Sequence, residues 1–382
     1  AGYEKYPKKN WRDLIKHKKG VLITDFADLK EFLIIQELKD GLPRIKFINK
    51  KNNKKTEIKF DEKAYQLNFN EGAEYASNLI RVNYSAMNVP ATVYQYNLKT
   101  EKRKKLKEQK IPAGFNKNRY ETKRVFAKSH DGKKIPISIL KLKTTKNNAP
   151  TLLYGYGSYG MSMAPSFSVA RLSLVDRGMV FAIAHIRGGM EKGRQWYLDG
   201  KLRKKKNTFK DFIKSAKFLK NSKISGDLTI HGGSAGGLLI GSTINMAPKL
   251  FKSAVADVPF VDVLNTILDA SLPLTPPEWE EWGNPILNKN DFLNIKSYSP
   301  YDNVRKQEYP SLLVTAGLTD PRVTYWEAAK WVARLRELKT DKNDIFLKTN
   351  MDAGHAGKAG RYHQIDETAF MYSFILNSHN LL

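Results

Sequence analysis

Three side chains of this sequence have the chemistry for nucleophilic acyl transfer. Ser234 lies in a glycine-rich segment, Asp320 follows a later apolar run, and His355 follows the next such run. A histidine can take the proton of a serine hydroxyl and return it to a leaving amine, while an aspartate holds the imidazole in the correct tautomer. The sequence therefore predicts Ser234 as nucleophile, His355 as general base and Asp320 as orienting acid.

The segment around Ser234 has the composition of a tight turn between a strand and a helix. Gly232, Ser234 and Gly236 match the pattern G-x-S-x-G, and a strand is expected over residues 227–231. Only small residues fit around such a strained serine, and the start of the following helix favours developing negative charge. The alternative is a purely structural glycine-rich turn or a phosphate cradle. The flanking strand and helix favour the nucleophile.

The proposed acid and base each lie on a loop directly after a predicted strand. Strands are expected over residues 311–315 and 344–349, and Asp320 and His355 follow them. Open parallel sheets gather their chemistry at the carboxyl ends of their strands. The order Ser, Asp, His along the chain is that of α/β-hydrolases. These positions therefore predict that the side chains meet at one edge of a sheet.

Two other residues compete for the acid and base roles. Asp352 lies too close to His355 in sequence to come from a separate strand end. His363 falls at the expected start of a helix. Both therefore rank below Asp320 and His355.

The chain divides into two regions that differ in the spacing of their apolar residues. Residues 1–115 contain short apolar runs separated by polar turns, which is typical of antiparallel meanders in a sandwich or a propeller. Residues 116–382 alternate strands with helices, which predicts a mostly parallel, doubly wound sheet of the α/β-hydrolase type. A charged connector is expected over residues 100–118. The expected strands of the second region lie at 150–154, 179–185, 227–231, 254–258, 311–315 and 344–349, and the helices at 208–220, 325–338 and 367–376.

Composition excludes several classes of site. The 382 residues include no cysteine, so disulfides, thiolate metal sites and cysteine nucleophiles are absent, and no metal or organic cofactor is expected. The net charge is +27, yet the lysines are spread along the chain without a nucleic-acid-binding signature. The densest basic runs, Lys102–Lys105 and Arg203–Lys206, are expected on solvated loops. No apolar run spans a membrane and the start is polar, so we expect a cytoplasmic protein that binds neither nucleic acid nor membrane.

The segment Tyr154–Gly160 follows the strand that usually contributes the second oxyanion donor of such a site. A tyrosine hydroxyl there can act beside the backbone N–H of Ala235 to bind a developing oxyanion. A Tyr-Gly turn can equally be structural. From the residues alone this assignment stays open.

Several segments together resemble the prolyl oligopeptidase family of serine peptidases, and within it the oligopeptidase B subfamily. The likeness extends over about residues 120–380, and residues 1–115 resemble less closely the end of that family's propeller. It is carried by Tyr154–Gly160, His185–Gly189, Lys206–Phe209, Gly232–Gly237, Pro259–Val263, Glu280–Pro285, Ser297–Val304, Tyr325–Glu327, Lys330–Ala333 and Leu335–Lys339.

This resemblance implies roles for further residues. It implies Ser234, Asp320 and His355 as the triad, and short peptides cleaved after Arg or Lys as the substrates. It assigns Tyr156 as oxyanion donor, Tyr159 and Arg322 to substrate binding, and Glu278 and Glu280 to the basic side chain before the cleaved bond. Carboxylates can hold a guanidinium through two parallel hydrogen bonds. The alternative for the two glutamates is a solvated acidic turn.

The sequence departs from the family pattern at three places. Met163–Phe167 stands where the subfamily carries two aspartates that favour a basic residue at P2, so we expect weak selectivity for dibasic sites. Met190 replaces a usual glycine. Asp257 replaces a usual glutamine and is a candidate for added acidity near the P1 pocket.

The chain has about half of the family's usual length, and only part of a propeller is expected. Unpaired sheet edges favour association. We therefore expect residues 1–115 to need further polypeptide, for example a second chain, to close the propeller. Two other functions remain open: an esterase or lipase that uses the same triad, and an inactive truncated binding protein.

Overall fold

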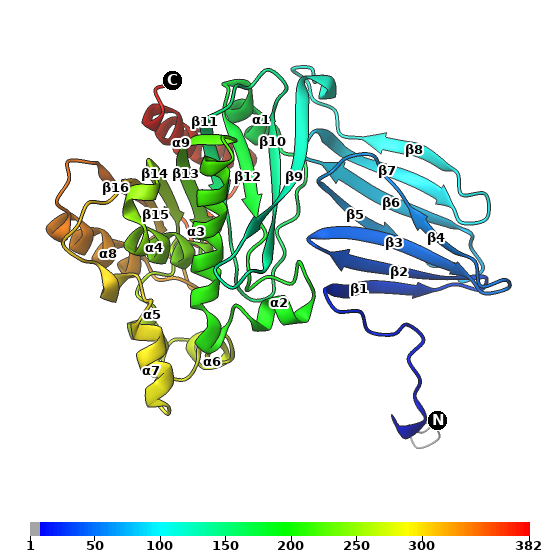
Figure 1. Cartoon of the computed structure of the whole chain (residues 1–382), viewed down its shortest axis with the longest axis horizontal. Coiled ribbons are helices and arrows are strands. Elements are labelled where there is room, and N and C mark those ends of the chain that lie inside the picture. Colours follow the sequence, from blue (N-terminus) through cyan, green and yellow to red (C-terminus); the bar gives the residue numbers. More distant parts are fainter. Residues whose placement is uncertain (1–7) are drawn as a thin grey trace.

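The computed structural model describes residues 8–382. Residues 1–7, which include the polar start, lie outside this range. Figure 1 shows two small antiparallel sheets beside a large central sheet, which is flanked by helices. Among the described residues, no helix is both long and apolar enough to cross a bilayer.

The two small sheets are four-stranded meanders whose strands follow one another in chain order. Asp40 and Gly41 join β2 to β3 with φ of 51° and 78°, the left-handed conformation that tight hairpin turns require. The two sheets share one apolar core, which includes Phe47 of β3 and Tyr96 of β7. They form the expected partial β-propeller. Their strands are β1 (Val21–Asp28), β2 (Phe32–Lys39), β3 (Leu42–Asn49), β4 (Lys55–Ile58), β5 (Tyr65–Asn70), β6 (Leu79–Ala86), β7 (Val89–Asn97) and β8 (Arg103–Glu108).

Both basic runs differ from the expected solvated loops. Lys102–Lys105 leads into the fully exposed strand β8, which pairs on one side with β7. Charged side chains on such an edge strand discourage further pairing. Arg203–Lys206 joins the 3₁₀ helix η4 (Leu202–Lys204) to helix α3 (Lys206–Asn221), and Lys205 within it is buried. The prediction failed because neighbours distant in sequence cover this lysine.

The large sheet has eight strands in the order β16-β15-β14-β13-β11-β12-β10-β9. The strands from β16 to β12 are parallel, whereas β9 and β10 are antiparallel. This arrangement confirms the predicted α/β-hydrolase fold. The strands are β9 (Tyr120–Lys128), β10 (Lys134–Leu142), β11 (Ala149–Tyr154), β12 (Val180–Ala184), β13 (Ser225–Gly233), β14 (Ser253–Asp257), β15 (Ser311–Gly317) and β16 (Ile345–Asn350).

Helices cover both faces of this sheet (Figure 1). Along β15, Leu312 and Val314 join the core beneath α3, α4 and α8, while Leu313 joins the core beneath α1 and α9. Buried strands of this kind are apolar on both faces. The helices are α1 (Val169–Asp176), α2 (Arg194–Leu198), α3 (Lys206–Asn221), α4 (Ala235–Met246), α5 (Val263–Leu268), α6 (Thr275–Trp282), α7 (Lys289–Lys296), α8 (Tyr325–Leu338) and α9 (Arg361–Ser378).

Each strand and helix predicted by residue range after residue 149 is present. Helix α8 has the predicted bounds, and the other elements differ at their ends. The sequence pattern missed the short helices α5, α6 and α7 between β14 and β15. Residues of α5 and α6, but none of α7, line the cavity at Ser234.

Candidate active site

Ser234 occupies the junction between β13 and α4. Its φ of 55° and ψ of −122° lie where a residue with a side chain is strained. Two neighbours hold this conformation: the Ser234 N–H donates to the Asp257 carbonyl at 2.8 Å, and the Phe260 N–H donates to the Ser234 carbonyl at 3.1 Å. The backbone on both sides of the junction thus fixes the serine.

The close approach of two backbone segments makes glycine necessary beside this serine. A Cβ on Gly232 would lie 2.4 Å from the Gly236 carbonyl oxygen, which no side chain can tolerate. Helix α4 begins at Ala235, and the first N–H groups of a helix have no partner within it. The Ala235 N–H is therefore well placed in the chain to bind an oxyanion beside Ser234.

Asp320 and His355 form a hydrogen-bonded pair. The His355 Nδ1 lies 2.7 Å from Asp320 Oδ2. The other carboxylate oxygen accepts the backbone N–H groups of Arg322 at 2.8 Å and Val323 at 3.0 Å. The carboxylate is fully buried, and the imidazole is largely buried. These contacts orient the ring and leave Nε2 as its remaining nitrogen.

The loops that carry this pair are joined through their backbones. The Leu318 N–H donates to the Asn350 carbonyl at 2.9 Å, and the Thr319 N–H donates to the Ala353 carbonyl at 3.3 Å. A Cβ on Gly317 would lie 2.6 Å from the Ala353 carbonyl oxygen. The adjacent strands β15 and β16 thus deliver the two loops side by side, as their order along the sheet requires.

The competing acid and base lie elsewhere. The Asp352 side chain is 84% exposed and makes a 3.7 Å ion pair with Lys358. His363 is exposed on the first turn of α9. The structure therefore pairs His355 with Asp320 and not with Asp352.

Ser234 and His355 are not joined by a hydrogen bond among the residues that the structure describes. Ser234 lines a cavity of about 410 Å³, whereas His355 lines another of about 400 Å³. Catalytic hydrogen bonds of a free enzyme are often loose and tighten when substrate binds. The structure brings two members of the predicted triad together and leaves the third contact unmade.

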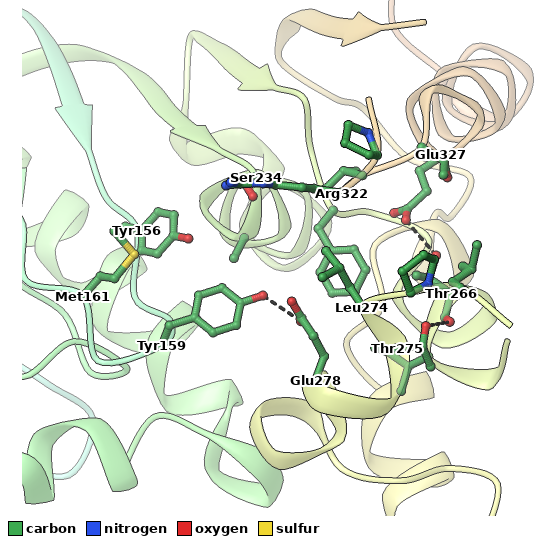
Figure 2. Close-up of a pocket in the computed structure, with 18 residues that line it drawn as sticks. Tyr156, Tyr159, Met161, Ser234, Thr266, Leu274, Thr275, Glu278, Arg322 and Glu327 are labelled. Atoms are coloured by element: carbon green, nitrogen blue, oxygen red, sulfur yellow. Dashed lines mark hydrogen bonds between the residues drawn. The ribbon is translucent and has the colours of Figure 1, made fainter. Parts of the chain in front are cut away.

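The cavity at Ser234 gathers most of the other predicted site residues. Tyr156, Tyr159, Glu278 and Arg322 all line it (Figure 2). Burial raises the pKa of Tyr156 to about 12, so its hydroxyl stays protonated at neutral pH. It can therefore donate a hydrogen bond into the cavity.

Glu278 is held with one carboxylate oxygen occupied. Its Oε2 accepts the Tyr159 hydroxyl at 2.8 Å and also the Trp282 indole N–H. Among residues 8–382, no hydrogen bond reaches Oε1. Figure 2 shows Glu278 and Tyr159 meeting on one side of the cavity. This oxygen is available to a positively charged side chain.

Glu280 is not brought to the same cavity. It is exposed on α6, two residues from Glu278, and a helix turns such neighbours to different sides. Glu281 is buried instead, and its Oε1 accepts the Tyr159 backbone N–H at 3.1 Å. Because helix α6 was not predicted from the sequence, the different directions of these glutamates were missed.

Glu327 is a cavity residue to which the sequence analysis gave no role. Its Oε2 accepts the backbone N–H groups of Val261 at 2.9 Å and Asp262 at 2.8 Å, and its Oε1 accepts the Thr266 hydroxyl at 2.7 Å. Burial raises its pKa to about 7. An acidic residue in the first turn of a helix is ordinarily a solvated one, so nothing in the local pattern marked it.

Asp257 and Met190, two of the departures from the family pattern, lie outside the cavity at Ser234. Asp257 lines the cavity of His355, not that of Glu278, and its Oδ2 lies 2.6 Å from His231 Nε2. Burial opposes ionisation of Asp257, but His231 and Thr315 outweigh it and hold the pKa below its usual value. Its suggested role near a P1 pocket therefore has no support. Met190 packs beneath Gly160, where a Cβ would lie 2.5 Å from the Met190 Cε.

Two family models match this chain. The model described as "Prolyl oligopeptidase family" matches residues 165–381. The model described as "Prolyl oligopeptidase, N-terminal beta-propeller domain" matches residues 4–109. The first match covers β12 to β16 of the large sheet, and the second covers the two small sheets.

Similar proteins extend well beyond the length of this chain. A protein named dipeptidyl aminopeptidase BI from Pseudoxanthomonas mexicana is 44% identical over 97% of this chain and 52% of its own. Protease 2 from Moraxella lacunata is 40% identical over 96% of this chain and 53% of its own. The structure of oligopeptidase B from Leishmania major matches with a TM-score of 0.90 and 42% identity, over 96% of this chain and 53% of its own. The chain thus spans about half the length of these proteins.

Proposed function

The chain belongs to the prolyl oligopeptidase family of serine peptidases, and from this premise we propose that it hydrolyses short peptides after Arg or Lys. The observation that carries the specificity is Glu278, which shares a cavity with Ser234 and keeps Oε1 free of protein hydrogen bonds among the described residues. A guanidinium or ammonium in that cavity gains a charge-assisted hydrogen bond.

The proposed reaction proceeds through an acyl-enzyme. Ser234 Oγ attacks the peptide carbonyl while His355 Nε2 takes its proton, and the resulting oxyanion receives hydrogen bonds from the Ala235 N–H and the Tyr156 hydroxyl. The protonated imidazole, stabilised by Asp320, then gives its proton to the leaving amine. Water attacks the acyl group by the same route in reverse and releases Ser234.

This route requires His355 to approach Ser234 when substrate binds. The imidazole lies on the loop after β16, and its Nδ1 is held by Asp320. The proposed movement is a shift of this loop that keeps the Asp320 contact and brings Nε2 to the serine hydroxyl. The buried pair supports this proposal, because it pre-orients the ring before substrate arrives.

Glu278→Gln tests the proposed specificity. We expect kcat/KM for an Arg amide to fall roughly 10- to 100-fold, because a hydrogen bond to a charged group contributes about 1.5–3 kcal/mol. Hydrolysis of a simple acyl ester should change little. Initial rates on both substrates measure the difference.

Glu280→Gln is the matched control, since Glu280 lies on the same helix but outside the cavity. It should leave both rates unchanged. Equal loss on both substrates in Glu278→Gln would contradict the P1 role. A wild-type chain that hydrolyses the ester far better than the Arg amide would favour the esterase alternative, and complete inactivity would favour the binding protein.

We also propose that the partial propeller requires further polypeptide for closure. Strand β1 is an edge strand, and its Phe26 side chain is 67% exposed. Exposed apolar residues on an edge strand favour association. We expect this chain alone to self-associate as its concentration rises, as measured by sedimentation velocity. A monodisperse, active monomer at high concentration would contradict this expectation.

A further inference from the structure

A lysine of the second basic run lies inside the protein. Arg203 and Lys204 are exposed, as expected for a charged run, but Lys205 is only 1% exposed. It stands between η4 and α3. Burial of a lysine is costly unless its ammonium group finds polar partners, so its contacts require an explanation.

Those contacts are with the loop that carries the proposed oxyanion donor. The Lys205 Nζ donates to the Gly157 carbonyl at 2.7 Å and to the Ser158 hydroxyl at 2.6 Å. Gly157 and Ser158 lie directly between Tyr156 and Tyr159. The ammonium also lies 4.8 Å from the centre of the Trp282 ring on α6, within range of a cation–π contact.

Lys205 thus connects two walls of the Ser234 cavity. On one wall, Tyr156 and Tyr159 project from the loop. On the other, Trp282 donates its indole N–H to Glu278. Figure 2 shows Tyr156, Tyr159 and Glu278 around one cavity, with Tyr159 hydrogen-bonded to Glu278. The loop is neither helix nor strand, so side-chain contacts of this kind determine its shape.

We propose that Lys205 is a positioning residue that holds the loop of Tyr156 and Tyr159 against α6. It would thereby keep the oxyanion donor Tyr156 and the carboxylate of Glu278, which would bind the P1 side chain, in place around Ser234. This inference rests on the proposed function. Lys205 touches neither substrate nor reacting atoms, and it acts through the Gly157 carbonyl, the Ser158 hydroxyl and the Trp282 ring.

The charge of the ammonium matters for this role. Among the described residues, no carboxylate lies within ion-pair distance of Lys205, and the charged group that acts on it is Glu281 of α6. Glu278 accepts the Trp282 indole N–H. Tyr156 and Tyr159 keep their protons at neutral pH because their pKa values are raised. Burial lowers the pKa of Lys205 to about 8. Loss of its proton removes one N–H donor and the cation–π contact.

Lys205→Met in the full chain tests the proposal. We expect kcat/KM for an Arg amide to fall by about 10- to 100-fold, chiefly through kcat, because small displacements of catalytic groups cost up to about 10²-fold. We also expect the wild-type rate to decline near pH 8 as Lys205 loses its proton. This alkaline decline should be absent from the pH–rate profile of the variant. Lys204→Met, an exposed neighbour, is the matched control and should behave as wild type.

A second readout separates this inference from the proposed specificity. The rate at which an organophosphonate labels Ser234 depends on the same loop but not on a basic P1 residue. One outcome is that Lys205→Met is labelled slowly while the wild type shows no preference for Arg substrates. That outcome would overturn the P1 assignment and support the role of Lys205. Absence of labelling in the wild type would overturn both proposals.

Equal kinetics and equal labelling in Lys205→Met and wild type would overturn the Lys205 role alone. A lower melting temperature with unchanged kinetics would overturn it as well. If Lys205→Met does not fold, Ser158→Ala is the substitute, because it removes one acceptor of the Lys205 ammonium with less disturbance. The proposal would be overturned if kcat of Ser158→Ala is unchanged and the wild-type rate does not decline near pH 8.

Discussion

Ser234→Ala is expected to lower kcat by about 10⁶-fold with little change in KM, the size of effect seen when a serine triad loses its nucleophile. The fold of the junction should persist, because alanine is small and the backbone contacts to Asp257 and Phe260 do not use the hydroxyl. The residual rate would come from the oxyanion donors, Ala235 N–H and the Tyr156 hydroxyl. Steady-state kinetics on an Arg amide measure both parameters.

Mass spectrometry after treatment with an organophosphonate locates the nucleophile directly. A single adduct on the peptide that contains Ser234 is expected in the wild type, and none in Ser234→Ala. Ser242→Ala is the matched control, because Ser242 lies on the same helix and donates its hydroxyl to the Tyr298 carbonyl. Labelling of another residue, or an active Ser234→Ala, would contradict the assignment.

Asp320→Asn is expected to lower kcat by about 10⁴-fold while the melting temperature changes little. The amide oxygen can still accept the N–H groups of Arg322 and Val323, so the loop keeps its shape. The amide NH₂ then faces His355 Nδ1 and forces that nitrogen to accept. The proton moves to Nε2, which can no longer take the proton of Ser234.

The control for this prediction is Asp352→Asn. Asp352 is exposed and paired with Lys358, so its loss should leave kcat unchanged. Kinetics and thermal unfolding of the two variants, measured in parallel, separate a wrong tautomer from a damaged fold. If Asp352→Asn loses activity and Asp320→Asn keeps it, the acid role passes to Asp352.

The sequence by itself determined those features that depend on local pattern. The glycines around Ser234 predict the strained junction because only small residues fit there, and the structure has it, with a φ of 55° at the serine. The apolar runs before Asp320 and His355 predict strands because buried parallel strands are apolar on both faces. Because β15 and β16 are adjacent, the loops that follow them bring Asp320 Oδ2 and His355 Nδ1 to 2.7 Å from each other.

Only the tertiary structure decided which charged side chains face the site. Glu278, Glu280 and Glu281 look alike in the sequence, yet one lines the cavity, one is exposed and one is buried beneath Tyr159. Lys205 looks like its neighbour Lys204, but only Lys205 is buried. Burial of a charged residue depends on partners that are distant in the chain, here Gly157 and Trp282, and no local spacing encodes them.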